Sequence, residues 1–154
     1  MTFLKNAWYA IAWSSDLGSE PMARTITSEC IVLYRRADGT PVALEDRCCH
    51  RALPLSLGRV EVDDIRCGYH GLRFAPTGAC VEVPGQSTIP PGAKVRSYPV
   101  VERWNTVWIW IGEAAAANTA TIPDVFWLDD PGWILSSGYI HMNSNYHLLV
   151  DNLL

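Results

Sequence analysis

The sequence predicts a mainly β domain built from antiparallel hairpins. Short apolar runs alternate with turn residues through most of the chain, as in strands with one buried face. Several neighbouring runs are joined by very short connections rich in turn-forming residues, which favours antiparallel pairing. With 154 residues, 49% of them hydrophobic, the chain is long enough for one domain, or for one domain and part of a second.

Three hairpins are expected along the chain. Their strands and turns are residues 30–36 and 41–46 around ADGT with Gly39, residues 72–74 and 79–84 around APTG with Gly78, and residues 94–103 and 106–112 around Trp104-Asn105. Residues 84–93 read as a Pro/Gly loop, and residues 113–120 as a helical turn or a connector.

The last part of the chain differs from the rest. Residues 138–143 are strand-like and are followed by a predicted helix with Ser144 or Asn145 as N-cap. Its apolar stripe consists of Tyr146, Leu149, Val150 and Leu153. Because the sequence stops at Leu154 without a glycine cap or a basic last turn, we expect a truncated protein.

Charge and targeting signals limit the possible partners. The formal net charge is −4 and there is no Lys/Arg run, which argues against nucleic acid and against an anionic membrane surface. The apolar run from Ala7 to Trp13 is too short to span a membrane and lacks the organisation of a signal peptide, so a cytoplasmic location is expected. An odd number of cysteines, five, in such a chain favours metal binding over disulfides.

Two cysteine–histidine pairs form the most informative motif. Cys48-x-His50 is followed, after sixteen intervening residues, by Cys67-x-x-His70, and both pairs lie between predicted strands where hairpin tips would present them. Four such ligands could form a Cys₂His₂ zinc site, although zinc sites usually pair like with like. Mixed pairs fit a binuclear centre better, with both thiolates on one iron and both imidazoles on the other, the ligand set of a Rieske [2Fe–2S] cluster. Four unrelated residues of a β core are the remaining alternative.

The mixed ligand set has a consequence for electron transfer. Two ferric ions, two sulfides and two thiolates sum to zero charge, whereas four thiolates would leave the oxidised cluster at −2. A neutral cluster accepts an electron more easily, so Rieske potentials run from about −150 to +300 mV, against about −400 mV for plant-type ferredoxins.

The stretches CCHRALPLSLG, CGYHGLRF and TGACVEVPG resemble the Rieske domain of ring-hydroxylating and demethylating non-haem iron oxygenases. MTFLKNAWYA, SYPVVERWNTVWIWIG and NYHLLVDNLL look most like the oxygenase subunits of vanillate and dicamba O-demethylases. The resemblance implies that Cys48 and Cys67 bind one iron and that His50 and His70 bind the other. It also implies a Rieske domain over residues 1–115, then a connector and the N-terminal fragment of a catalytic domain over residues 116–154.

The resemblance further implies a function for the parent protein. It would be the oxygenase component of a monooxygenase acting on an aromatic methyl ether or a similar acid, a homotrimer supplied with electrons by an NAD(P)H-dependent flavin and ferredoxin reductase. His70 would pass the electron to the bridging aspartate of a neighbouring subunit. The mononuclear Fe(II) ligands are expected beyond the helix Asn145 to Asn152, so this chain would carry electrons without oxygenating anything. The alternative, a stand-alone Rieske ferredoxin, leaves residues 123–154 without a role.

Cys49 departs from the family pattern, in which proline usually stands between the first cysteine and histidine. We hypothesise that its backbone N–H bonds a cluster sulfur and raises the reduction potential. The other interpretation is that the fold tolerates cysteine in place of proline at this position without any functional effect. Arg51 could contact a partner or set the field at the cluster, or do neither, while Gly68 and Gly71 would allow close backbone approach.

Other metal-binding residue types have simpler interpretations. His147 and Asp151 lie one helical turn apart and are expected to form an exposed ion pair rather than a 2-His-1-carboxylate site with His141. Cys30 and Cys80 lie in strand-like runs and are expected to serve packing.

Overall fold

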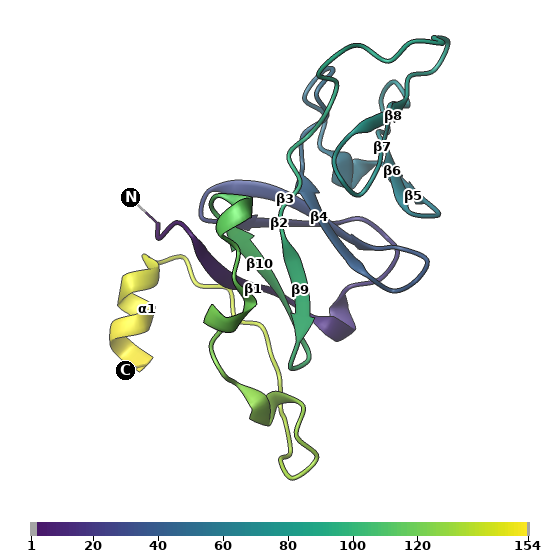
Figure 1. The fold of residues 1–154 in the computed structure, drawn as a ribbon. Helices are drawn as coiled ribbons and strands as arrows, with labels where there is room; N and C mark the ends of the chain where they lie inside the picture. Colours follow the sequence, from purple (N-terminus) through teal and green to yellow (C-terminus); the bar gives the residue numbers. More distant parts are fainter. Residues whose placement is uncertain (1–2, 154) are drawn as a thin grey trace.

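The computed structural model describes residues 3–153, which contain ten strands in three antiparallel sheets and one α-helix (Figure 1). The strands are β1 (Ala7–Trp13), β2 (Met22–Ile26), β3 (Glu29–Arg35), β4 (Pro41–Glu45), β5 (Arg59–Glu61), β6 (Asp64–Arg66), β7 (Arg73–Phe74), β8 (Cys80–Glu82), β9 (Val100–Arg103) and β10 (Thr106–Ile111). The helices are α1 (Tyr146–Leu153) and the short 3₁₀ turns η1 (Ser14–Asp16), η2 (Leu55–Leu57), η3 (Ala114–Ala116), η4 (Thr119–Thr121) and η5 (Phe126–Leu128). The predicted mainly β fold class is confirmed.

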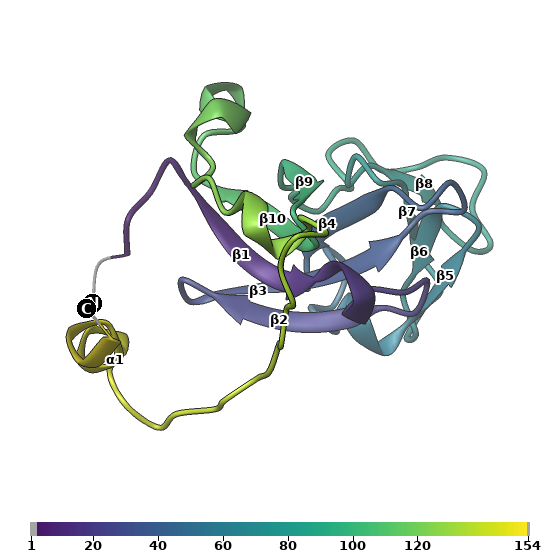
Figure 2. The same ribbon diagram turned by 90° about the horizontal axis from the view of Figure 1, so that it is seen from below.

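Two of the sheets pack face to face, and the third stands at one end of them (Figures 1 and 2). The sheet β1–β10–β9 faces the sheet β2–β3–β4 across a core that includes Ile11, Ile31, Leu33 and Ile109. The third sheet runs in the order β5–β6–β7–β8. A second core joins it to the other face of β3 and β4, the one turned away from β1–β10–β9. We call this group the site core, and it consists of Val32, Tyr34, Val42, Leu44, Cys48, Leu55, Ile65, Cys67, Leu72, Phe74, Cys80 and Val95.

The three predicted hairpins are present. β3 pairs with β4 through a turn containing Gly39 at φ 84°, and β7 pairs with β8 through a turn containing Gly78 at φ 82°. β9 pairs with β10 directly across Trp104 and Asn105, at φ 55° and 56°. Two successive residues with positive φ are typical of the type I′ turn, whose twist matches that of the flanking strands. Local turn chemistry therefore identified these pairs, whereas the long-range pairing of β1 with β10 has no local signal.

The end of the chain is predicted in part. Helix α1 forms where expected, and the side-chain oxygen of Asn145 accepts a hydrogen bond from the backbone N–H of His147 at 3.0 Å. The strand expected at residues 138–143 is wrong, because these residues form no strand and Tyr139 and Ile140 are 85% and 84% exposed. A strand requires a hydrogen-bonded neighbour, and residues 3–153 provide none for this segment.

Hydropathy adds one finding. None of the helices formed by residues 3–153 has both the length and the apolar character that crossing a membrane requires.

Candidate metal centre

The two cysteine–histidine motifs lie in loops of the same construction. In each loop the cysteine accepts and donates backbone hydrogen bonds that close a tight turn, and the fourth residue after it has positive φ. The first loop has Cys48 N–H to Leu53 O at 2.8 Å and Ala52 N–H to Cys48 O at 2.9 Å; the second has Cys67 N–H to Leu72 O at 2.8 Å and Gly71 N–H to Cys67 O at 3.2 Å. Ala52 stands at φ 57° and Gly71 at φ 76°. The loops therefore present equivalent backbone frames.

The origins of the two loops differ. The second connects β6 to β7, which pair with each other, so its position at a hairpin tip is as predicted. The first runs from β4 to η2 and then to β5, which lies in another sheet, so the expected hairpin tip is wrong here. A connection between sheets has to satisfy contacts on both sides, and no local turn motif records that requirement.

The loops bring like residues together. Cys48 and Cys67 are both buried, at 3% exposure, and the Cys67 thiol lies close enough to contribute to the raised pKa of the Cys48 thiol. The rings of His50 and His70 lie with centroids 4.6 Å apart at an interplanar angle of 61°, and both residues are exposed. The site therefore has a sulfur side facing the protein interior and an imidazole side facing solvent.

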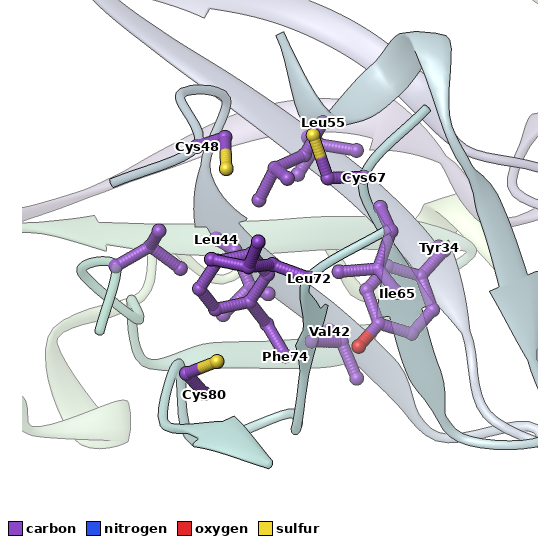
Figure 3. Packing of buried hydrophobic residues seen from close by; sticks show 12 residues of the cluster. Tyr34, Val42, Leu44, Cys48, Leu55, Ile65, Cys67, Leu72, Phe74 and Cys80 are labelled. Atoms are coloured by element: carbon purple, nitrogen blue, oxygen red, sulfur yellow. The ribbon is translucent and has the colours of Figure 1, made fainter. Parts of the chain in front are cut away.

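The sulfur side is continuous with the site core. Cys48 and Cys67 lie along one side of the packed apolar residues, and Cys80 lies on the other (Figure 3). Burial raises the pKa of the Cys48 thiol to about 11, although the backbone N–H groups of His50 and Arg51 lie close enough to this sulfur to lower it. A metal that binds here has to displace the proton, since thiolate is the ligand form.

Backbone contacts hold the two loops against each other. A Cβ atom on Gly58 would lie 2.0 Å from the carbonyl oxygen of Arg66, and one on Gly68 would lie 2.8 Å from the carbonyl oxygen of Leu57. Close approach at Gly68 is as predicted, but it brings the turn η2 against the second loop. Gly58 has the same role and was not identified from the sequence.

Two side chains that the sequence analysis missed clamp the loops. Asp46 accepts hydrogen bonds from the backbone N–H of Ser56 at 2.7 Å and from its hydroxyl at 2.6 Å, which fixes the first loop. Arg66 donates to the carbonyl oxygen of Gly71 at 2.7 Å and pairs with Glu61 at 2.8 Å and Glu82 at 3.0 Å. Asp46 lies two residues before Cys48 and Arg66 lies one residue before Cys67, and this proximity to the candidate ligands is the only local signal of their role.

The remaining cysteines have different environments. Cys80 is buried in the site core, so its predicted packing role is confirmed. Cys30 is exposed at the start of β3, so the packing role predicted for it is wrong; the buried stretch of that strand begins at the next residue. Cys49 belongs to the first loop and is exposed as a residue, but partial burial of its thiol raises the pKa of that thiol. Its backbone N–H lies near its own thiol, and the hypothesis that it bonds a cluster sulfur stays a prediction.

The histidines of the C-terminal segment lie apart from this site. His141 shares a hydrogen bond with Asn143 at 3.0 Å, and the His147 ring packs on Tyr146 with centroids 4.1 Å apart. The ion pairs of residues 3–153 do not include the one expected between His147 and Asp151. Within the same residues, no three metal-binding side chains surround a position for one ion. A cluster with two protein ligands on each of two irons does not need such a group.

The residues present fit a binuclear iron–sulfur centre. Two buried thiols lie close together beside the site core, two imidazoles lie close together at the surface, and the backbone N–H groups of His50 and Arg51 lie near the Cys48 sulfur. Fold and site together therefore describe a β domain whose paired loops are suited to hold an iron–sulfur cluster.

Comparison with known proteins identifies the family. Residues 7–99 match the family model of the Rieske [2Fe-2S] domain, and the chain belongs to this family. It is 54% identical over 153 residues to the toluene-4-sulfonate monooxygenase system iron-sulfur subunit TsaM1 of Comamonas testosteroni, covering 99% of this chain and 44% of that protein. It is 45% identical to the dicamba O-demethylase oxygenase component of Stenotrophomonas maltophilia, covering 100% of this chain and 46% of that protein.

A solved structure agrees with this assignment. Dicamba monooxygenase with non-heme iron and dicamba superposes with a TM-score of 0.95 at 44% identity, over 99% of this chain and 47% of that chain. The chain thus spans less than half the length of these relatives. The predicted resemblance to the Rieske domain of oxygenase components is confirmed, although the sulfonate monooxygenase subunit is more similar than the O-demethylases named from the sequence.

Proposed function

We propose that this chain takes up and releases one electron at a time through a Rieske [2Fe–2S] cluster. Cys48 and Cys67 would hold one iron, and His50 and His70 the other. The observation that carries the proposal is the segregation of the ligands: buried thiols on one side and exposed imidazoles on the other. When bound, the cluster supplies reversible one-electron chemistry at a potential above that of four-thiolate clusters.

The chain's own residues account for the orientation of this site. The site core and the clamps of Asp46 and Arg66 hold the sulfur side rigidly and exclude water from it. The imidazole side is reached from solvent, and the Tyr69 ring packs against His70 with centroids 3.7 Å apart. Electrons exchanged with another protein would therefore enter and leave through the histidine edge rather than through the apolar core.

The wider role is proposed from the relatives. In a longer protein the chain would pass electrons to the mononuclear iron of an aromatic-compound monooxygenase or O-demethylase, after receiving them from an NAD(P)H-dependent flavin and ferredoxin reductase. Such a protein would be a homotrimer, in which residues 1–115 form the Rieske domain and residues 116–154 lead into the catalytic domain. Three relatives support this role by name: a toluene-4-sulfonate monooxygenase subunit, a dicamba O-demethylase oxygenase component and a vanillate O-demethylase oxygenase subunit.

One observation bears on the alternative of a stand-alone electron carrier. Residues 123–153 contain no buried residue, yet they carry Trp133, Ile134, Tyr139 and Ile140 in exposed positions. A carrier complete in itself has no need of such a segment, whereas an oxygenase component would bury it against further protein.

A reductive titration tests the proposal. The purified chain is reduced stepwise at controlled potential while its visible spectrum is recorded. We expect uptake of one electron per chain with a midpoint between about −150 and +300 mV. Uptake near −400 mV, or no redox activity with metal bound, would contradict it. As a control, Cys30→Ser changes an exposed thiol that belongs to neither loop, leaves the backbone intact and should leave the midpoint unchanged.

A further inference from the structure

The His70 ring has an aromatic neighbour on its own loop. The Tyr69 ring packs against it with centroids 3.7 Å apart at an interplanar angle of 34°. Aromatic pairs usually lie with centroids about 4.5–7 Å apart, so the faces of these two rings overlap closely. The His50 ring meets His70 differently, edge to face at 61° with centroids 4.6 Å apart. Among residues 3–153, His70 therefore has a stacked partner and His50 has none.

The backbone of the second loop produces this contact. Hydrogen bonds from Cys67 N–H to Leu72 O at 2.8 Å and from Gly71 N–H to Cys67 O at 3.2 Å close the loop, and Gly71 stands at φ 76°. In an extended strand, two consecutive side chains point to opposite faces. In this closed turn Tyr69 and His70 instead lie together on the solvent side, where both residues are exposed.

The hydroxyl group of Tyr69 does not hold its side chain in place. Tyr9, Tyr34 and Tyr98 each donate a hydrogen bond through the hydroxyl. Within residues 3–153 the Tyr69 hydroxyl makes no such bond to the protein, and the residue is 64% exposed. The face contact with the His70 ring is therefore what fixes the position of this side chain.

We infer that Tyr69 is a positioning residue for the proposed electron-transfer site: its ring orients the His70 imidazole and keeps water from one face of it. The inference rests on the proposed one-electron function and deepens it by assigning a residue that sets the reduction potential. Because His50 has no stacked partner within residues 3–153, the two ligand imidazoles are not equivalent.

Covering one face of His70 has a defined effect on the reduction potential. The cluster core has no net charge when oxidised, and reduction gives it one negative charge. Water near the ligands stabilises that charge, and solvent access is one of the factors that set the potential of such centres. A tyrosine ring in the place of water makes the electron harder to add. Tyr69 therefore lowers the reduction potential.

Exposed aromatic residues also serve as contacts for other proteins. That role needs a partner and leaves the reduction potential of the isolated chain unaffected. A positioning role changes this potential in the absence of any partner. Measurements on the cluster-loaded chain alone therefore distinguish the two roles.

The test compares the reduction potentials of three cluster-loaded variants with that of the parent chain at pH 7. Tyr69→Ala removes the ring, Tyr69→Phe keeps it without the hydroxyl, and Tyr139→Ala removes an 85% exposed tyrosine from another region. We expect Tyr69→Ala to shift the equilibrium towards the reduced form about three- to tenfold, where tenfold is about 59 mV for one electron. Tyr69→Phe and Tyr139→Ala should stay within about twofold of the parent chain.

Pulsed electron paramagnetic resonance of the same reduced samples adds a test of ring orientation. It measures the magnetic couplings of the imidazole nitrogens bound to iron, which depend on how each ring is turned. Tyr69→Ala should change the coupling of one imidazole, and Tyr69→Phe should change neither.

Three results would overturn the inference. An unchanged or lowered potential in Tyr69→Ala, whatever the couplings, would show that the ring does not screen His70. An equal shift in Tyr69→Phe would assign the effect to the hydroxyl. If Tyr69→Ala does not load its cluster, Tyr69→Leu replaces it, because a branched aliphatic side chain has no flat face to stack. The same rise in potential is then expected, and an unchanged potential overturns the inference.

The same samples separate this inference from the proposed function. A parent chain that contains the cluster and takes up one electron, but whose potential does not respond to Tyr69, overturns only the positioning role. A parent chain without an iron–sulfur cluster overturns the proposed function, and this inference with it.

Discussion

Similar apolar and aromatic side chains have opposite environments in two regions of the molecule. One region surrounds the two cysteine–histidine loops, and the other is the segment from residue 123 to residue 153. Around the loops, Ile65 and Phe74 are completely buried in the site core. In the segment, Ile134 is fully exposed and Tyr139 and Ile140 nearly so. Figure 2 shows the segment running away from the sheets before it ends in α1. The same residue types are therefore stabilising in one region and available for contact in the other.

The difference separates local from non-local determinants of structure. Helix α1 forms in the exposed segment because its hydrogen bonds and its Asn145 cap are local. Residues 138–143, just before this helix, form no strand, because a strand needs hydrogen bonds to a neighbouring strand from another part of the chain. Around the loops, the strands have hydrogen-bonded neighbours in three sheets. These sheets fix the positions of the two loops and therefore the geometry of the site.

The largest effect is expected at a ligand. Cys67→Ser should give colourless, poorly soluble protein, because cluster binding and folding are coupled and the residue is also part of the site core. His70→Ala should also lose the cluster. Iron, sulfide and visible absorbance are measured beside Cys30→Ser, which should stay coloured. A stable, red-brown Cys67→Ser protein would contradict the ligand assignment.

The second-largest effect is expected from a cavity in the site core. Phe74→Ala is expected to lower the free energy of unfolding by about 3–5 kcal/mol, because a fully buried ring is removed from a packed core. Ile140→Ala in the exposed segment should change it by no more than about 0.5 kcal/mol. Chemical denaturation followed by circular dichroism measures both. Similar losses in the two variants would show that the exposed segment is packed in solution.

Adding a single methyl group gives a smaller, matched contrast. Gly58→Ala places a Cβ 2.0 Å from the carbonyl oxygen of Arg66, whereas Gly138→Ala meets nothing within 4 Å, and neither glycine has positive φ. We expect Gly58→Ala to cost about 1–3 kcal/mol through overpacking of the two loops. Gly138→Ala should be neutral or slightly stabilising. Equal denaturation midpoints would mean that the loops do not press on each other as described.

The smallest effect is expected at Cys49. If its backbone N–H bonds a cluster sulfur, Cys49→Pro removes the donor and should lower the reduction potential by some tens of millivolts, on the scale where 59 mV equals about 1.4 kcal/mol for one electron. Cys49→Ala keeps the N–H and should keep the potential. Protein-film voltammetry measures the reduction potential of both variants. An unchanged potential in Cys49→Pro would contradict the hydrogen bond from the Cys49 N–H to the cluster.

Sequence patterns predicted the parts of this protein that depend on neighbouring residues. Turn residues such as Gly39 and Gly78 identified the hairpins, and the spacing of the four candidate ligands predicted two facing loops. The patterns did not predict that the first loop joins different sheets, because that depends on contacts far along the chain. Nor did they reveal the clamps of Asp46 and Arg66, since hydrogen bonds to loop backbone leave no periodicity.

The measurement that tests the central claim most directly is electron paramagnetic resonance of the dithionite-reduced chain, with iron and acid-labile sulfide assayed on the same sample. Histidine ligation of one iron predicts a rhombic signal of low average g, with two irons and two sulfides per chain. Zinc without sulfide would instead mean a structural metal site, and the one-electron function proposed for this chain would be wrong.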